Sequence, residues 1–169
     1  NPGDIARIGG HLSLPPTAFV RPIPLTGENL DYRPYAFSLG GEKRYLLALK
    51  KRGKGCIFLL KFPGKDRCGI HEARPNVCRC YPFSFERGYP KKVRQMLCPD
   101  GWELSKPEEK AFSSWYDRLK KDAFFFQALL DTWHSEVLPM VLTAKKRQPS
   151  APQVFERLLS FLLSRVKKA

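Results

Sequence analysis

The sequence predicts an α+β fold, in which a small β-hairpin and irregular Cys-rich loops pack with a helical C-terminal region. Three observations predict it. Two short strand-like runs flank a turn at residues 53–55, the stretch 63–102 is dense in Gly, Pro, Arg and Cys, and helical periodicity dominates after residue 105. With 169 residues, 43% of them hydrophobic, the chain is long enough to bury a core.

The first predicted element is a helix over Asp4–Leu12, where Ile5, Ile8 and Leu12 recur at helical spacing. Two prolines in the run 13–16 end it, because proline cannot continue a helix. The Pro- and Gly-rich residues that follow contain a short extended piece over Arg21–Leu25.

A β-hairpin is predicted next. Arg44–Lys50 has strand character, Gly53-Lys54-Gly55 forms the turn, and Cys56–Lys61 is the predicted partner strand. This arrangement places Cys56 at the start of the second strand, where the adjoining loop can bend toward a shared site.

The C-terminal part is predicted to be helical. Ser105 and Glu108 have the spacing of a capping box, an amphipathic pattern follows, and Pro139 kinks or ends that helix. The run 148–152 breaks the pattern before a last helix over Gln153–Lys167. We therefore divide the chain at residue 104, into a Cys-containing domain over 1–104 and a helical extension over 105–169.

The five Cys are the first indication of function. Their odd number does not suit a disulfide framework, and neither a signal peptide nor an apolar run of membrane-spanning length is visible, so we expect a cytoplasmic protein. Clustered Cys in a reducing compartment favour metal binding or redox chemistry. A metal would also organise the irregular stretch 63–102, because ligand bonds replace part of a core.

The spacing of the Cys leaves the type of site open. They follow one another as Cys56-x11-Cys68-x9-Cys78-x1-Cys80-x17-Cys98. This is the spacing of neither a zinc ribbon nor a bacterial ferredoxin. Thiolates are soft ligands that suit zinc and the iron of iron–sulfur clusters, and four of them complete either site. The alternative is that several Cys are buried as small hydrophobic side chains.

The residues around the Cys are more specific. The chain reads Gly55-Cys56-Ile57-Phe58-Leu59, then Cys68-Gly69-Ile70-His71-Glu72-Ala73-Arg74-Pro75-Asn76-Val77-Cys78-Arg79-Cys80-Tyr81-Pro82-Phe83, then Cys98-Pro99-Asp100-Gly101. This resembles the pattern of the YkgJ-like cysteine-cluster family of zinc- or iron-chelating domains: C-x-F-L, then C-x-I-[YH]-E-x-R-P-x-x-C-R-x-[YF]-P-F, then C-P-G. The resemblance runs from about Asp4 to about Trp102, and Cys68–Phe83 is its specific part.

The resemblance implies a set of four metal ligands: Cys56, Cys68, Cys78 and Cys98. Cys80 stands where the family usually carries another residue, so it is an extra ligand, a spare thiol or without a role. The family also has a Cys-x2-Cys-x2–3-Cys-Cys cluster just before the helix that begins near Asp4. That N-terminal cluster is not in this chain, which begins at Asn1. A site completed by it would hold several metal ions or a larger cluster.

Three further side chains near the Cys are candidates. His71 lies three residues after Cys68, close enough to bind the metal or to hydrogen-bond to a ligand. The guanidinium groups of Arg74 and Arg79 either donate to the thiolates and lower their charge, or pair with carboxylates and carbonyls in a purely structural role.

The net charge is +14, from 30 basic and 16 acidic residues. Such a surface attracts nucleic acids, acidic membranes or acidic proteins. The basic residues are dispersed in pairs and triplets, and no aromatic-spaced RNA-binding motif lies among them. A solvated basic surface is therefore the alternative to a nucleic-acid interface.

Three functions remain open. The first is a metal-binding protein that holds zinc or iron, including an iron–sulfur cluster, through Cys thiolates. The second rests on the resemblance alone and is a cluster-dependent enzyme related to flagellin lysine N-methylases; the sequence has neither a Gly-rich nucleotide loop nor a Cys-x3-Cys-x2-Cys motif. The third is a basic nucleic-acid-binding protein with a structural metal. The C-terminal helices could also bind a protein partner.

Overall fold

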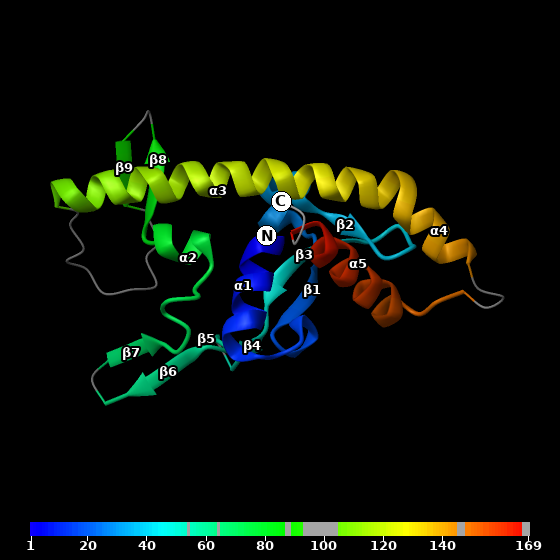
Figure 1. Ribbon diagram of the computed structural model, residues 1–169, viewed down its shortest axis with the longest axis horizontal. Helices are drawn as coiled ribbons and strands as arrows, with labels where there is room; N and C mark the ends of the chain where they lie inside the picture. The colour runs from blue at the N-terminus through cyan, green and yellow to red at the C-terminus, as the bar shows by residue number, and fades with distance from the viewer. Residues whose placement is uncertain (54, 64, 87–88, 93–104, 145–147, 167–169) are drawn as a thin grey trace.

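The fold is that of a computed structural model, which describes the following residues: 1–53, 55–63, 65–86, 89–92, 105–144 and 148–166. Figure 1 confirms the predicted α+β class, with small antiparallel sheets in the N-terminal half and long helices in the C-terminal half. Among the described helices, none combines the length and the apolar character that crossing a bilayer requires.

The chain opens with helix α1 (Pro2–Leu12), as the helical spacing of its isoleucines predicts. Asn1 caps it, because its side-chain oxygen accepts a hydrogen bond from the Asp4 N–H at 3.0 Å. The helix ends at Ser13, whose backbone is left-handed (φ 53°) and whose N–H donates to the Gly9 carbonyl.

A three-stranded antiparallel sheet follows, with β3 (Arg44–Leu49) between β1 (Val20–Pro24) and β2 (Phe37–Ser38). The extended piece predicted near Arg21 is therefore an edge strand, where the missing N–H groups of its prolines need no partner. Two 3₁₀ segments connect these elements: η1 (Pro16–Ala18) and η2 (Gly27–Tyr35).

The predicted hairpin is present, but its strands pair differently. Only β4 (Lys51–Arg52) and β5 (Gly55–Cys56) pair across the turn, where Gly53 has φ +60°. The strand expected at 44–50 pairs with β1 and β2 instead. The physical reason lies after Cys56, where the chain leaves the strand as a turn and the Phe58 ring packs on the core residue Phe19 at 5.9 Å.

Short elements order part of the stretch expected to be irregular. They are β6 (Leu59–Phe62), β7 (Lys65–Cys68), α2 (Asn76–Cys80), β8 (Phe83–Glu86) and β9 (Tyr89–Lys92). Strand β7 pairs with β6, and β9 pairs with β8, each pair as an antiparallel hairpin. The part of the prediction that falls on residues 93–104 lies outside the described residues.

The C-terminal helices begin close to the predicted positions. Helix α3 (Lys106–Thr132) starts directly after Ser105 and passes through a π-helical turn, η3 (Trp133–Val137), into α4 (Leu138–Thr143). The Leu138 N–H bonds to the carbonyl of Trp133, five residues back. Pro139 comes next, and a proline ring crowds the carbonyl four residues before it, so the wider turn relieves this clash. Figure 1 shows the predicted bend there.

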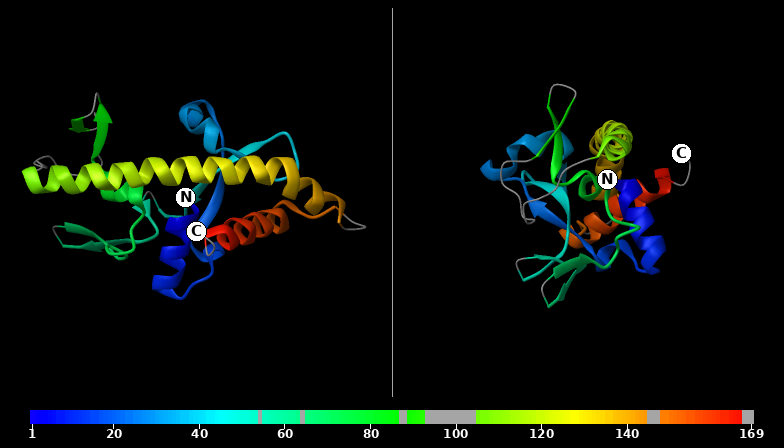
Figure 2. Two further views of the ribbon diagram at one scale, coloured as in Figure 1. Left: turned by 45° about the horizontal axis from the view of Figure 1, so that its top comes forward. Right: turned by 90° about the vertical axis from the view of Figure 1, so that its left-hand side faces the viewer.

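The last helix, α5 (Ala151–Val166), supplies the centre of the core. Its side chains Val154, Leu158 and Leu162 are fully buried, and the helix packs against α1. Trp133 is fully buried as well, and its indole N–H donates to the Ser38 carbonyl in β2 at 3.1 Å. Figure 2 looks along α3 in its right-hand view and shows the strands of the sheet on one side and α1 on the other.

Candidate metal centre

Three of the four predicted ligands come from three different elements. Cys56 ends β5, Cys68 ends β7, and Cys78 lies in the middle of α2. The β6–β7 hairpin returns Cys68 toward Cys56, because Cys68 pairs with Leu59, only three residues after Cys56. The next residue, Gly69, extends this pairing through a 2.8 Å hydrogen bond from its N–H to the Phe58 carbonyl. The hairpin thereby brings Cys68 near Cys56, although 11 residues separate the two in the sequence.

The ionisation of the Cys78 thiol depends on both Cys56 and Cys68. Loss of hydration at the thiol, followed by negative charge on Cys56 and Cys68, raises its pKa to about 11, whereas the positive charge of Arg74 acts in the opposite direction. Three neighbouring thiols are a suitable donor set for a soft cation, because a bound cation would replace the repulsion that Cys78 meets from Cys56 and Cys68 by attraction. The residues present therefore fit a zinc or iron centre.

The thiols are neighbours rather than a finished coordination shell. All four described Cys are free, and Cys56 and Cys78 are exposed while Cys68 is half-buried. Among the residues that the structure describes, no group of three or more His, Cys, Asp and Glu side chains is arranged to hold a metal ion. The fourth predicted ligand, Cys98, lies outside the described residues.

Cys80 has a different environment. It follows Cys78 by two residues in α2, and two helical residues turn a side chain by about 200°, so the two thiols point to opposite sides. Cys80 is 4% exposed, and burial raises its pKa, an effect that the charge of Arg74 reduces. The structure thus separates Cys80 from the three grouped thiols, which is the arrangement expected of a spare thiol.

Helix α2 is fixed by a network of polar residues that the sequence analysis did not identify. The backbone N–H of Asn76 donates to the buried Asp4 carboxylate in α1 at 3.1 Å, and the Asn76 side-chain amide donates to Asp122 in α3 at 2.7 Å. Arg7 also donates to Asp4. Because 72 and 46 residues separate these partners, no local spacing in the sequence could indicate the network.

The two candidate arginines have different surroundings. Arg79 donates to backbone carbonyls, those of Glu72 and, at 3.3 Å, Arg74, as the structural alternative expects. Burial raises the pKa of both Cys78 and Cys80, and the positive charge of Arg74 acts against this effect, in the direction that favours thiolate. The Nε atom of Arg74 is buried without a hydrogen-bond partner among the described residues.

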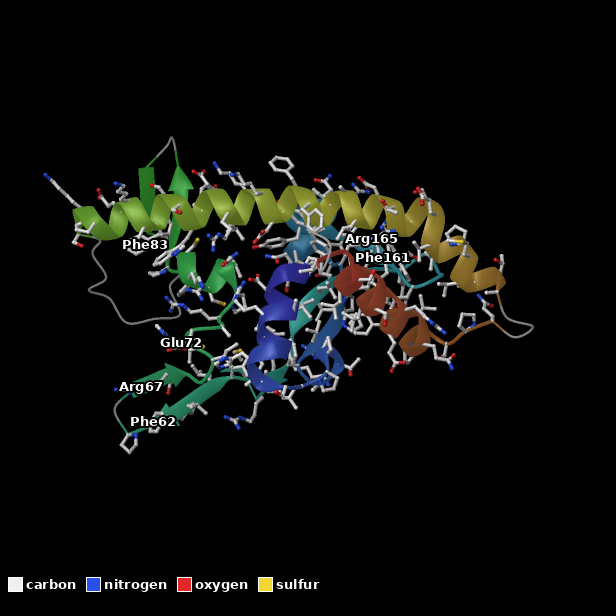
Figure 3. The ribbon with its side chains drawn as sticks, in the orientation of Figure 1. Phe62, Arg67, Glu72, Phe83, Phe161 and Arg165 are labelled. Atoms are coloured by element: carbon white, nitrogen blue, oxygen red, sulfur yellow. The ribbon has the colours of Figure 1, made fainter. Side chains whose placement is uncertain are left out.

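Other residues of the specific sequence stretch lie on either side of α2. His71 is exposed in the turn after Cys68. Figure 3 shows Glu72 between the β6–β7 hairpin and α2, and it shows Phe83 beside α2 and beneath α3. The Phe83 ring packs edge-on against Phe112 of α3, with 5.7 Å between the ring centroids. Phe83 therefore anchors the segment after α2 to the long helix.

A comparison with family models covers the part of the chain that contains these thiols. Residues 28–111 match the family described as "CxxCxxCC: Putative zinc- or iron-chelating domain", and all five Cys lie within the match. No curated protein and no solved structure matches the chain. The CxxCxxCC motif that gives the family its description does not occur in this sequence. Because residues 28–111 match this family's model, the chain belongs to the CxxCxxCC family of zinc- or iron-chelating domains.

Proposed function

We propose that the protein is a metal-binding module in which Cys56, Cys68, Cys78 and Cys98 hold zinc or iron as thiolates. The observation that supports this most is the convergence of three thiols from β5, β7 and α2, in which Cys56 and Cys68 are both close enough to affect the ionisation of Cys78. Bound zinc or iron would supply the positive charge that replaces the thiol protons and joins the three elements.

The residues around the thiols prepare them for this role. Arg74 contributes positive charge next to Cys78, which favours the thiolate that a metal requires. Asp4 and Asp122 hold the N-terminal end of α2 in place from two other helices, so that Cys78 is carried on a fixed support. Free thiols also persist best in a reducing compartment, and we propose the cytoplasm.

The first experiment is elemental analysis with an absorption spectrum on the full chain, purified without oxygen. Iron with matching sulfide and a broad visible band would identify an iron–sulfur centre. Colourless protein with stoichiometric zinc would identify a zinc–thiolate centre. Folded protein without any metal, even after addition of zinc or iron, would contradict the proposal.

Two variants test the ligand set. Cys78→Ser is expected to lose most of its metal and to melt at a lower temperature, because a serine hydroxyl is a poor replacement for a soft thiolate. Cys80→Ser is the matched control, since Cys80 faces the other side of the same helix. Full metal content in Cys78→Ser would contradict the assignment, and loss of metal from Cys80→Ser would make Cys80 a ligand.

The net charge of +14 supports a second candidate, a nucleic-acid-binding protein whose metal is structural. Phosphate contacts give affinities that fall steeply with salt. Binding to duplex DNA or RNA at low salt, with a steep salt dependence, would support this candidate. No binding at low salt would exclude it without affecting the proposed metal centre.

A further inference from the structure

A pocket of about 400 Å³ opens away from the Cys residues, where η2, the start of β3 and the C-terminal end of α3 meet. Its polar lining consists of Arg33, Arg44, Gln127, Asp131 and His134, and its apolar lining includes the buried Leu130. This volume and this mixture of an apolar wall with a few convergent polar groups are typical of small-molecule sites.

One wall of the pocket is held in a defined arrangement by His134. The Ser38 backbone N–H donates to the Nε2 atom of His134 at 3.1 Å. Because Nε2 accepts this bond, the contact of Arg44 with the same atom, also at 3.1 Å, has Arg44 as its donor. Burial and the charge of Arg44 lower the pKa of His134, in agreement with a neutral ring. A neutral His134 therefore orients the Arg44 guanidinium without neutralising its charge.

The π-helical turn η3 makes this arrangement possible. Its adjacent residues Trp133 and His134 bond to the carbonyl and the N–H of Ser38, respectively, and so fix the turn to β2. A π turn widens a helix locally and is frequent at functional sites.

Three of the polar side chains that line the pocket have no hydrogen-bond or ion-pair partner among the residues that the structure describes. Among the residues that the structure describes, Arg33, Gln127 and Asp131 make no side-chain hydrogen bond or ion pair within 4.0 Å. The charges that face the pocket are then two guanidinium groups and one carboxylate, with a neutral imidazole between them. A ligand that satisfies each of them carries two anionic groups and one cationic group.

We propose that this pocket binds a small amino-dicarboxylate, a molecule of the acidic amino acid class. Its two carboxylates pair with Arg33 and Arg44, its ammonium group pairs with Asp131, and its carbon chain lies on the apolar wall formed in part by Leu130. Gln127 provides an amide for a further hydrogen bond. This site is independent of the proposed metal centre.

The test is calorimetric titration of the full chain with three probes of nearly the same shape. L-glutamate carries both carboxylates and the ammonium group, L-glutamine lacks one carboxylate, and glutarate lacks the ammonium group. We expect L-glutamate to bind most tightly, with a loss of about tenfold for each missing charged group. Absence of saturable binding by L-glutamate, or equal affinity for all three probes, would overturn the proposal.

Two variants assign the partners. Arg33→Gln should weaken L-glutamate binding by about tenfold and remove its advantage over L-glutamine, whereas Asp131→Asn should remove its advantage over glutarate. Neither side chain makes a hydrogen bond or an ion pair with a residue that the structure describes, so both variants should keep the fold. Arg157→Gln, an exposed change of the same charge on α5, is the control. Unchanged L-glutamate affinity in Arg33→Gln, or an equal loss in Arg157→Gln, would show that only the general basic charge attracts the probe.

Discussion

The two cysteines of α2 show how strongly the environment of a single residue decides its role. Cys78 is exposed and lies near two other thiols, whereas Cys80, two residues further on, is 4% exposed. The sequence could group Cys78 with Cys56 and Cys68 by the family pattern alone. The sequence did not decide the role of Cys80, because the direction of a side chain on so short a helix depends on which side of that helix is covered.

Substitution of Cys80 separates packing from metal binding. Cys80→Ser buries a hydroxyl in place of a thiol, so we expect the free energy of unfolding to fall by about 1 kcal/mol. Metal content per folded molecule should not change. Urea unfolding and elemental analysis measure the two effects separately, and Cys80→Ala provides a control that adds no polar group.

The thiol of Cys78 predicts a pH dependence in the metal-free protein. Its pKa is raised from 9.0 to about 11, so the folded state keeps a proton that the unfolded chain releases over this range. The free energy of unfolding should therefore fall as the pH rises from about 9 to about 11. Urea unfolding across this range tests it. In Cys78→Ser this part of the pH dependence should be absent, and an identical slope in both proteins would contradict the assignment.

At the level of elements, helix α2 depends on partners in α1 and α3. Only five residues long, α2 has no side-chain cap, and the buried Asp4 carboxylate accepts the N–H of its first residue instead. An isolated helix of this length is unstable in water, so tertiary contacts must supply its stability. The predicted helix over Asp4–Leu12 was correct, but the role of Asp4 depends on a contact that the sequence does not reveal.

Removal of the Asp4 carboxylate should therefore cost stability. Asp4→Ala leaves the Asn76 N–H and the Arg7 guanidinium without their partner, and we expect the free energy of unfolding to fall by about 3 kcal/mol. Urea unfolding is the measurement. Asp117→Ala is the matched control, because its ion pair with Lys120 is exposed and should contribute nothing measurable. Equal effects of the two substitutions would show that Asp4 does not support α2.

At the level of the whole molecule, the core joins the two predicted parts of the chain. Ile8 of α1 and Phe37 of β2 belong to the same buried cluster as Trp133 and Leu158. The division at residue 104 into a Cys-containing domain and a helical extension stays a prediction. The core nevertheless shows that α5 and the C-terminal end of α3 pack with the sheet and α1.

The central position of α5 can be tested by a single truncation. Leu158 is fully buried, and Leu158→Ala should lower the free energy of unfolding by about 3 kcal/mol through lost burial and the cavity left behind. Arg157→Ala, at the exposed neighbouring position, should change little. Thermal or urea unfolding compares the two variants. An effect of Leu158→Ala no larger than that of Arg157→Ala would contradict the assignment of α5 to the core.

The sequence by itself determined the fold class, the start of α3, the starts of α1 and α5 to within two residues, the bend at Pro139 and the candidate thiols, because caps, periodicity and proline act over a few residues. Only the tertiary structure decided which strands pair, which side of α2 faces the grouped thiols, and that Asp4, Asn76 and Asp122 meet. These contacts join residues far apart in the chain, and their choice depends on which surfaces the core buries.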